Sequence, residues 1–176
     1  MEFVVLVNEG DEQIGTMEKL EAHRKGLLHR AFSVFLFNDN GEMLLQQRAA
    51  TKYHSPLLWT NACCSHPREN ETVLNAAKRR LMEEMNISTP LSQIDSFIYK
   101  AELDNNLTEH ELDYIIIGQY NNLVTPNADE VQDYCYLSFD AIESAIELHP
   151  NKFTVWFKIA LPIVKEAFLR NKHLAA

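Results

Sequence analysis

The sequence has too few cysteines and too little apolar continuity for several classes of protein. Its 176 residues include three cysteines, two of them adjacent, which makes a poor disulfide framework and favours a reducing compartment. No apolar run approaches the ~20 residues that cross a bilayer. The first residues lack the basic region of a secretory signal, so we expect a cytoplasmic protein that does not enter membranes.

Basic residues are also scarce relative to acidic ones. Lysine and arginine total 16 against 25 aspartate and glutamate residues, which gives a net charge of −9. Nucleic acids and anionic membranes are usually bound by basic surfaces, so we expect neither as a partner. A small anionic substrate remains compatible with this charge, because bound divalent cations reverse the local field of an acidic site.

The length and the hydrophobic pattern predict a single domain over residues 1–176. Strands are expected where β-branched and aromatic residues recur, and helices where apolar residues recur every three to four positions. The predicted strands cover residues 3–8, 31–37, 42–47, 96–101, 114–120 and 134–139, and the predicted helices cover 72–85, 141–148 and 154–170. This order indicates an α+β fold, with helices packed on a mixed sheet.

Local signals mark several boundaries of these elements. Asn40-Gly41 tolerates the positive φ angles of a tight hairpin, and Asn70 and Asp140 are suitable N-caps for the first two helices. Pro162 should kink the last helix or interrupt it.

The segment from Trp59 to Pro67 is the most informative part of the chain, because it brings a thiol and an imidazole together. Cys64 is a possible acid or base, and His66, two residues later, is a possible metal ligand. Cys63 is expected to pack beside the site without reacting. Cys135 is expected to be structural.

The helix that follows pairs Arg79 with Glu83 and Arg80 with Glu84 at a spacing of four. Such pairs are usually exposed salt bridges. Glu71, however, precedes Arg79 by eight residues, and this completes a spacing similar to the Nudix box. Ser65 and Asn86 replace glycines of that box, and Arg80 replaces a carboxylate, which should impair the metal cluster of a Nudix hydrolase.

Three histidines and two glutamates form a candidate metal site. Glu109 and Glu111 would point the same way in an extended segment. His23, His29 and His66 are far apart in sequence, and each alone is more often a surface or core histidine than a ligand. Together, the five would suit a six-coordinate Mn, Fe, Co or Zn ion better than Mg.

Further candidates are four cations and two aromatic residues. The cations are solvated surface charges or, together, a diphosphate clamp: Lys19, Arg48, Lys52 and Arg80. Trp156 is either a packing residue or holds its π face against a developing cation. Tyr99 is either a core residue of a strand or a hydroxyl donor.

Taken together, these residues resemble the type 1 isopentenyl-diphosphate delta-isomerases, metal-dependent members of the Nudix superfamily. The likeness runs from residue 15 to Trp156, and its specific segments are residues 28–33, 48–49, 59–61, 64–67 and 109–111. The stretch between His23 and His29 is shorter than the family pattern, and Cys63 and Ser65 replace an aliphatic residue and a glycine. These departures remove none of the proposed catalytic groups.

The resemblance implies a Nudix-like fold and a role for each candidate. It implies one divalent metal (Mn, Zn or Mg) bound by His23, His29, His66, Glu109 and Glu111, and Mg bound with the substrate diphosphate through Glu84. Cys64 and Glu111 would be catalytic, with Tyr99 bonded near the acid and Trp156 shielding a carbocation. Lys19, Arg48, Lys52 and Arg80 would bind the diphosphate, and no flavin would be needed.

The implied reaction interconverts isopentenyl and dimethylallyl diphosphates in isoprenoid biosynthesis. It adds a proton to one face of an alkene and removes one from the other, so the pocket must exclude water. Two rival functions are a Nudix hydrolase of a nucleoside diphosphate derivative and a non-catalytic metal- or nucleotide-binding module. We expect a monomer or a weak homodimer.

Overall fold

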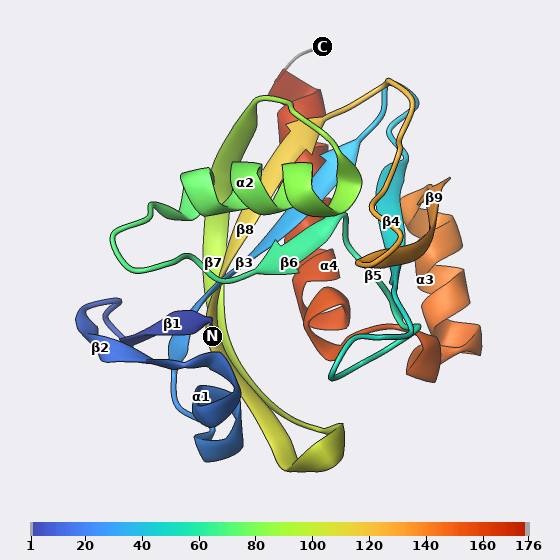
Figure 1. The fold of residues 1–176 in the computed structure, drawn as a ribbon. Coiled ribbons are helices and arrows are strands. Elements are labelled where there is room, and N and C mark those ends of the chain that lie inside the picture. Colours follow the sequence, from blue (N-terminus) through green and yellow to red (C-terminus); the bar gives the residue numbers. More distant parts are fainter. Residues whose placement is uncertain (1, 175–176) are drawn as a thin grey trace.

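The computed structural model describes residues 2–174, with side chains described up to residue 170, and shows one mixed sheet flanked by helices (Figure 1). The strands are β1 Phe3–Val7, β2 Gln13–Glu18, β3 His29–Phe37, β4 Met43–Arg48, β5 Trp59–Thr60, β6 Cys63–Ser65, β7 Leu91–Leu103, β8 Leu107–Gln119 and β9 Val131–Leu137. The helices are α1 Lys19–Lys25, α2 Val73–Met85, α3 Phe139–Leu148 and α4 Val155–Leu174, with short 3₁₀ turns at Asp104–Asn106 and Pro150–Lys152. The predicted α+β class is confirmed. Within residues 2–174, no helix combines the length and the apolarity that crossing a bilayer requires.

Strand β3 is the centre of the sheet. It pairs in parallel with β8, from His29 opposite Glu111 to Phe37 opposite Gln119. Its other neighbours, β1, β4 and β6, run antiparallel to it. The long β7–β8 hairpin extends one side, and β9 pairs with β4 on the other.

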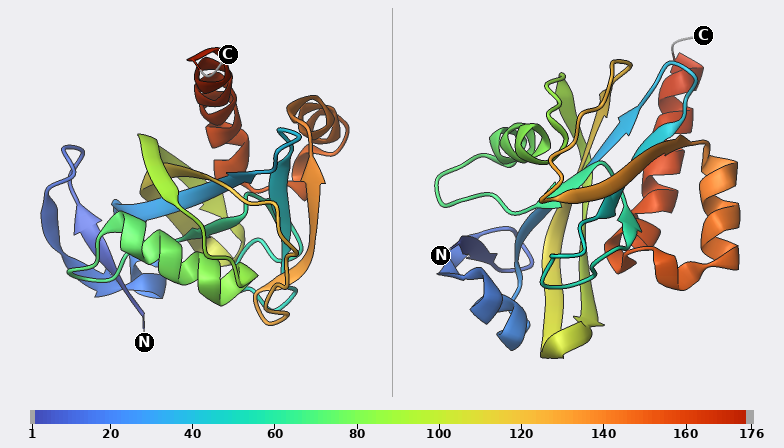
Figure 2. Two further views of the ribbon diagram at one scale, coloured as in Figure 1. Left: turned by 90° about the horizontal axis from the view of Figure 1, so that it is seen from above. Right: turned by 45° about the vertical axis from the view of Figure 1, so that its right-hand side comes forward.

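Helices cover both faces of this sheet, as the two further views show (Figure 2). Alternate residues of a strand point to opposite faces, so Phe32, Val34 and Leu36 pack with α2 while Phe35 and Phe37 pack with α3 and α4. Burial on both faces explains why β3 is a nearly continuous apolar run and not an alternating one.

The hairpin after β3 forms as predicted, with Gly41 at φ 76°. Both predicted N-caps are wrong by two residues. Thr72 caps α2 by accepting a hydrogen bond from the Asn75 amide, and Ser138 caps α3. Asn70 instead takes a left-handed conformation in the turn before α2, with φ 62°.

The last helix continues through Pro162, so of the two predicted outcomes, a kink or an interruption, the interruption is wrong. Leu161 and Val164 on either side of the proline are buried against the sheet, and this packing stabilises the helix despite the hydrogen bond that proline cannot make. The structure also contains α1, which the sequence did not predict. Its seven residues begin after Glu18, whose carboxylate accepts hydrogen bonds from Leu20 and Glu21.

Candidate functional site

A cavity of about 70 Å³ lies where α1, α2, α4 and the central strands converge. Ten predicted site residues line it: Lys19, Arg48, Lys52, Cys64, His66, Arg80, Glu84, Glu109, Glu111 and Trp156. The other three, His23, His29 and Tyr99, lie against Glu111. The fold therefore brings all of the predicted residues to one place.

Three imidazoles meet the carboxylate of Glu111. The His66, His29 and His23 Nε2 atoms lie 3.0, 3.4 and 3.8 Å from Glu111 Oε1. The parallel pairing of β3 with β8 sets His29 directly beside Glu111, whereas His23 comes from α1 and His66 follows β6. Four ligand atoms from these residues lie within 4.8 Å of one another.

Backbone carbonyls fix the orientation of two of these rings. His23 Nδ1 lies 2.7 Å from the Lys19 carbonyl oxygen, and His29 Nδ1 lies 2.8 Å from that of Leu27. Both Nδ1 atoms therefore carry the proton, and each Nε2 presents a lone pair. Those two Nε2 atoms are buried and have no hydrogen-bond partner among the described residues. Buried polar atoms are almost always satisfied, so this arrangement fits a metal ion.

A second group shares His23 with the first. His23, His54 and Glu109 also offer ligand atoms within 4.8 Å of one another. Burial, followed by the charge of Arg48, lowers the pKa of His54 to about 2, and burial lowers that of His23 to about 4. Both rings are therefore neutral near pH 7, the form that binds metals.

Tyr99 joins the two carboxylates predicted to be metal ligands. Its hydroxyl donates to Glu111 Oε2 at 2.7 Å and lies 3.0 Å from Glu109 Oε2. Burial and the neighbouring Glu111 charge raise the pKa of Glu109. Burial acts in the same direction on Glu111, but its close contacts with His29 and His66 outweigh burial and hold its pKa well below the usual value. One charge thus resides mainly on Glu111.

Cys64 lies on β6 opposite Ser33 of β3. Burial raises its pKa to about 12, so it is a thiol near neutral pH. Its neighbour Cys63 points to the other face and is buried in the core beside α2, as expected of a packing residue. Cys135 is half-buried in β9 and packs against the α3–α4 core, which agrees with a structural role.

Arg48 binds the backbone of the neighbouring loop and lies beside the Cys64 thiol. Its guanidinium donates to the backbone carbonyls of His54 and Ser55, each at 3.1 Å, and one nitrogen lies 3.8 Å from Cys64 Sγ. The same group lies 5.4 Å from the centroid of the Trp156 ring. Arg48 therefore contacts a π system that the sequence predicted either to pack in the core or to face a developing cation.

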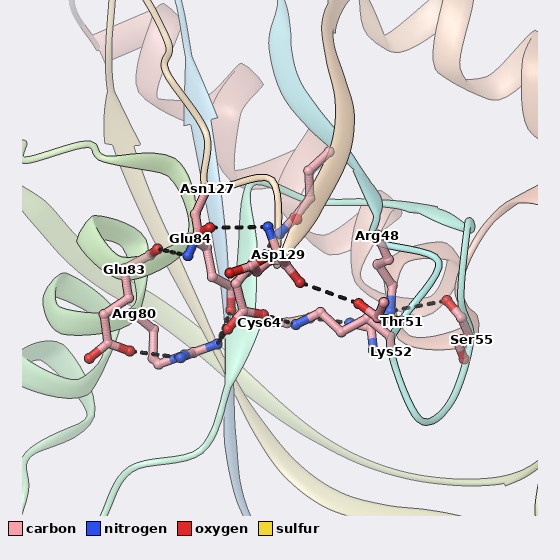
Figure 3. Close-up of polar contacts among 12 residues, drawn as sticks. Arg48, Thr51, Lys52, Ser55, Cys64, Arg80, Glu83, Glu84, Asn127 and Asp129 are labelled. Carbon is pink, nitrogen blue, oxygen red and sulfur yellow. Dashed lines mark hydrogen bonds and ion pairs between the residues drawn. The ribbon is translucent and has the colours of Figure 1, made fainter.

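The other cations are paired with carboxylates in this state of the pocket. Arg80 contacts Glu83 and Glu84 at 2.7 Å and Glu130 at 3.2 Å, which confirms the predicted Arg80–Glu84 pair. Lys52 pairs with Glu130, and Lys19 pairs with Glu2. Figure 3 shows Arg80 extending from α2 toward Glu84, with Lys52 and Arg48 on the opposite side.

Arg79 does not point into the pocket. It makes two 2.8 Å contacts with Glu71 and a 3.5 Å contact with Glu83, so these members of the Nudix-like spacing fasten the loop before α2 to the helix. Glu84 instead faces inward, and its Oε2 accepts a 2.9 Å hydrogen bond from Gln46.

Seven lining residues were not among the predicted site residues: Glu2, Ala31, Phe32, Ser33, Tyr53, His54 and Ser65. Their neighbour Asp113 was missed as well. It is buried and accepts a 2.8 Å hydrogen bond from Ser33. The i, i+2 argument that predicted a shared face for Glu109 and Glu111 would have added Asp113 two residues later.

Comparisons with known proteins agree with this geometry. The NUDIX domain family matches residues 27–157. Isopentenyl-diphosphate Delta-isomerase 2 of Photorhabdus laumondii is 50% identical over 89% of both chains. Isopentenyl-diphosphate Delta-isomerase of Aliivibrio fischeri strain MJ11 is 48% identical over 99% of this chain and 98% of its own.

Solved structures with low sequence identity share the fold. DR0079 from Deinococcus radiodurans superposes with a TM-score of 0.71 at 19% identity, over 84% of this chain and 90% of its own. A Nudix hydrolase from M. smegmatis, RenU, gives a TM-score of 0.58 at 14% identity, over 95% of this chain and 94% of its own. The predicted Nudix-like fold is therefore confirmed.

Proposed function

Because the chain belongs to the isopentenyl-diphosphate Delta-isomerases of the NUDIX family, we propose that its pocket interconverts isopentenyl and dimethylallyl diphosphates. One observation supports this most: Cys64, Glu111 and Trp156 line the same cavity, beside a cluster of imidazoles.

The reaction transfers two protons and leaves the net charge of the substrate unchanged. One acid adds a proton to the terminal alkene carbon, which forms a C–H bond and leaves positive charge on the tertiary carbon. One base removes a proton from the neighbouring methylene, and that electron pair becomes the new double bond. Cys64 and Glu111 are the proposed donor and acceptor, because both reach the cavity and, among the described residues, neither forms an ion pair with lysine or arginine.

The intermediate cation must not meet water, and Phe32 and Trp156 contribute apolar side chains to a cavity that is otherwise lined mainly by polar ones. Trp156 is 3% exposed and lines the cavity, so its ring can stabilise positive charge by about 2 kcal/mol when desolvated. Tyr99 is the proposed positioning residue for Glu111, through its 2.7 Å hydrogen bond.

We propose that His23, His29, His66, Glu109 and Glu111 hold a divalent metal. The unpartnered Nε2 atoms of His23 and His29 support this assignment, and the nitrogen-rich donor set favours Mn or Zn over Mg. The metal would supply positive charge that holds the Glu111 carboxylate in place. No flavin is part of the proposal.

Glu84 is the proposed ligand of a Mg ion that accompanies the substrate diphosphate, because its carboxylate is buried at the cavity wall. Lys19, Arg48, Lys52 and Arg80 are the proposed contacts of the diphosphate. Binding must then exchange the carboxylates of Glu2 and Glu130 for phosphate oxygens.

Deuterium incorporation tests this function. The purified protein is incubated with isopentenyl diphosphate in D₂O, with and without a chelator. We expect dimethylallyl diphosphate carrying deuterium, in a metal-dependent reaction without flavin. Cys64→Ala and Glu111→Gln should abolish the conversion while circular dichroism stays unchanged. Near-normal turnover in either variant would refute the assignment of that residue.

The rival hydrolase predicts a different product from the same incubation. Arg80 replaces a carboxylate of the Nudix box and pairs with Glu83, so a hydrolytic metal cluster would lack one ligand and find another already paired. We therefore expect no inorganic phosphate from isopentenyl diphosphate and no nucleoside monophosphate from nucleoside diphosphate derivatives. Release of either without isomerisation would favour the hydrolase.

We also propose that the chain acts as one domain, as a monomer or weak homodimer in the cytoplasm, without nucleic-acid or membrane partners. The acidic net charge of −9 supports the last two points.

A further inference from the structure

We propose that His54 is a sixth protein ligand of the metal centre, in addition to the five that the sequence predicted. The inference rests on the proposed metal site but not on the proposed reaction. His54 belongs to the loop between β4 and β5, away from every segment that suggested metal binding in the sequence.

The backbone of His54 is held in place at the pocket. Arg48 donates to the carbonyl oxygens of His54 and Ser55 at 3.1 Å each, and Ser55 takes a left-handed conformation with φ 47°. The His54 side chain is 6% exposed and lines the cavity. Its ring stacks on that of His23, with centroids 5.9 Å apart at an interplanar angle of 30°.

The ring also faces a predicted ligand. His54 Nδ1 lies 3.7 Å from Glu109 Oε1, while Tyr99 holds the other oxygen of Glu109. Metal–ligand bonds of about 2.1 Å put neighbouring ligands of an octahedron about 3 Å apart and opposite ones about 4.2 Å apart. The separations at Glu109 and Glu111, from 3.0 to 3.8 Å, lie within this range.

His23 shows that the two groups belong to a single ion. It is a member of both groups, and its Nδ1 carries a proton that is donated to Lys19. Its Nε2 therefore has the one lone pair that can bind metal, and one lone pair binds one ion. An ion bound by His54 and Glu109 together with His23 is then the same ion that His29, His66 and Glu111 bind. The two groups are separate at 4.8 Å, so the side chains of His54 and Glu109 would move toward the ion on binding.

Six protein ligands would close the coordination shell. Each glutamate would contribute a single oxygen, so Glu111 Oε2 would stay outside the shell, where Tyr99 contacts it. No position would remain for a bound water, whereas catalytic zinc sites usually keep one open. A closed shell matches a reaction in which water destroys the intermediate.

Water-proton relaxation of the full-length protein loaded with Mn²⁺ tests the proposal. A closed shell excludes exchangeable water, so the wild type should show little paramagnetic enhancement. His54→Ala should open a position and raise the enhancement clearly. Zn²⁺ affinity, measured by competition with a chromophoric chelator, should fall about 10- to 100-fold or more.

Two variants control this experiment. His54→Gln keeps a polar side chain of similar size, so a properly folded His54→Gln protein should show the same two changes without a packing defect. His149→Ala removes an exposed histidine after α3 and should leave both readouts unchanged.

Unchanged enhancement and affinity in both His54 variants would overturn the proposal. So would a wild-type protein that already holds an exchangeable water, or a loss of affinity without any gain of water, which would make His54 only a support for Glu109. Isomerisation is measured separately, so a wild type that fails to turn over refutes the proposed function while the coordination result stands.

Discussion

Replacing Tyr99 with phenylalanine should slow the reaction sharply and destabilise the fold only moderately. The substitution keeps the buried ring and removes one hydroxyl, whose oxygen lies 2.7 Å from Glu111 and 3.0 Å from Glu109. Both carboxylates are buried, so no bulk water replaces the lost donor.

The expected loss of rate and of stability follows from the charge on the hydrogen-bond acceptor, Glu111. A hydrogen bond to a charged group contributes about 1.5–3 kcal/mol. If the bond to Glu111 positions the catalytic oxygen, its loss lowers kcat about 10- to 160-fold, because each 1.36 kcal/mol is tenfold in rate. The free energy of unfolding, from urea denaturation, should fall by about 1.5–3 kcal/mol.

Tyr114→Phe, on the neighbouring strand β8, is the matched control. Tyr114 donates its hydroxyl to the Asp11 carboxylate, so the chemical change is identical, but the residue lies on the opposite face of β8 from Glu111. We expect lower stability and a kcat within about twofold of the wild type. A Tyr99→Phe enzyme with unchanged kcat, or a Tyr114→Phe enzyme slowed as much, would refute the positioning role.

Three further predictions test the pocket and the sheet. Alkylation of Cys64 by iodoacetamide should be very slow at pH 9, because a thiol of pKa about 12 is only about 0.1% thiolate at that pH. Rapid labelling of this residue, located by mass spectrometry, would contradict the raised pKa. Glu130→Gln should lower the KM for isopentenyl diphosphate about two- to fivefold, since it releases Lys52 and Arg80 from a competing carboxylate. An unchanged KM would show that these ion pairs do not oppose substrate binding. Gly118→Ala should lower the free energy of unfolding in urea by about 1–3 kcal/mol, because the added Cβ would lie 2.8 Å from the carbonyl oxygen of Pro90, just before β7. An unchanged free energy of unfolding would mean that the backbone at this end of the strand shifts to accommodate the methyl group.

The sequence predicted most accurately the strands and helices whose core-facing side is mainly apolar. Strand β3 and helix α2 were found nearly at their observed bounds, because burial gives them strong patterns. The hairpin strands β7 and β8 were predicted to be much shorter than Leu91–Leu103 and Leu107–Gln119. Their site-facing residues include Glu109, Glu111 and Asp113, and carboxylates at buried positions hide the strand pattern.

The candidate site was predicted largely through its motifs, and the residues outside them were missed. His54 lies in a loop, where no periodicity indicates the direction of a side chain. Its approach to Glu109 depends on the Arg48 contacts to the loop backbone. Glu2 and Glu130 were missed for a similar reason, because ion pairs between distant segments exist only after folding.

The carboxylates of β8 have a consequence for how this family can tolerate insertions and deletions. Glu109, Glu111 and Asp113 share a face only because the strand alternates with a period of two. Losing a single residue upstream of them within the strand would shift the frame and turn Leu112 and Tyr114 toward the cavity in place of the carboxylates. A longer turn at Asp104–Asn106 would leave this frame intact, whereas within β8 only a change of two residues would keep the carboxylates on one face.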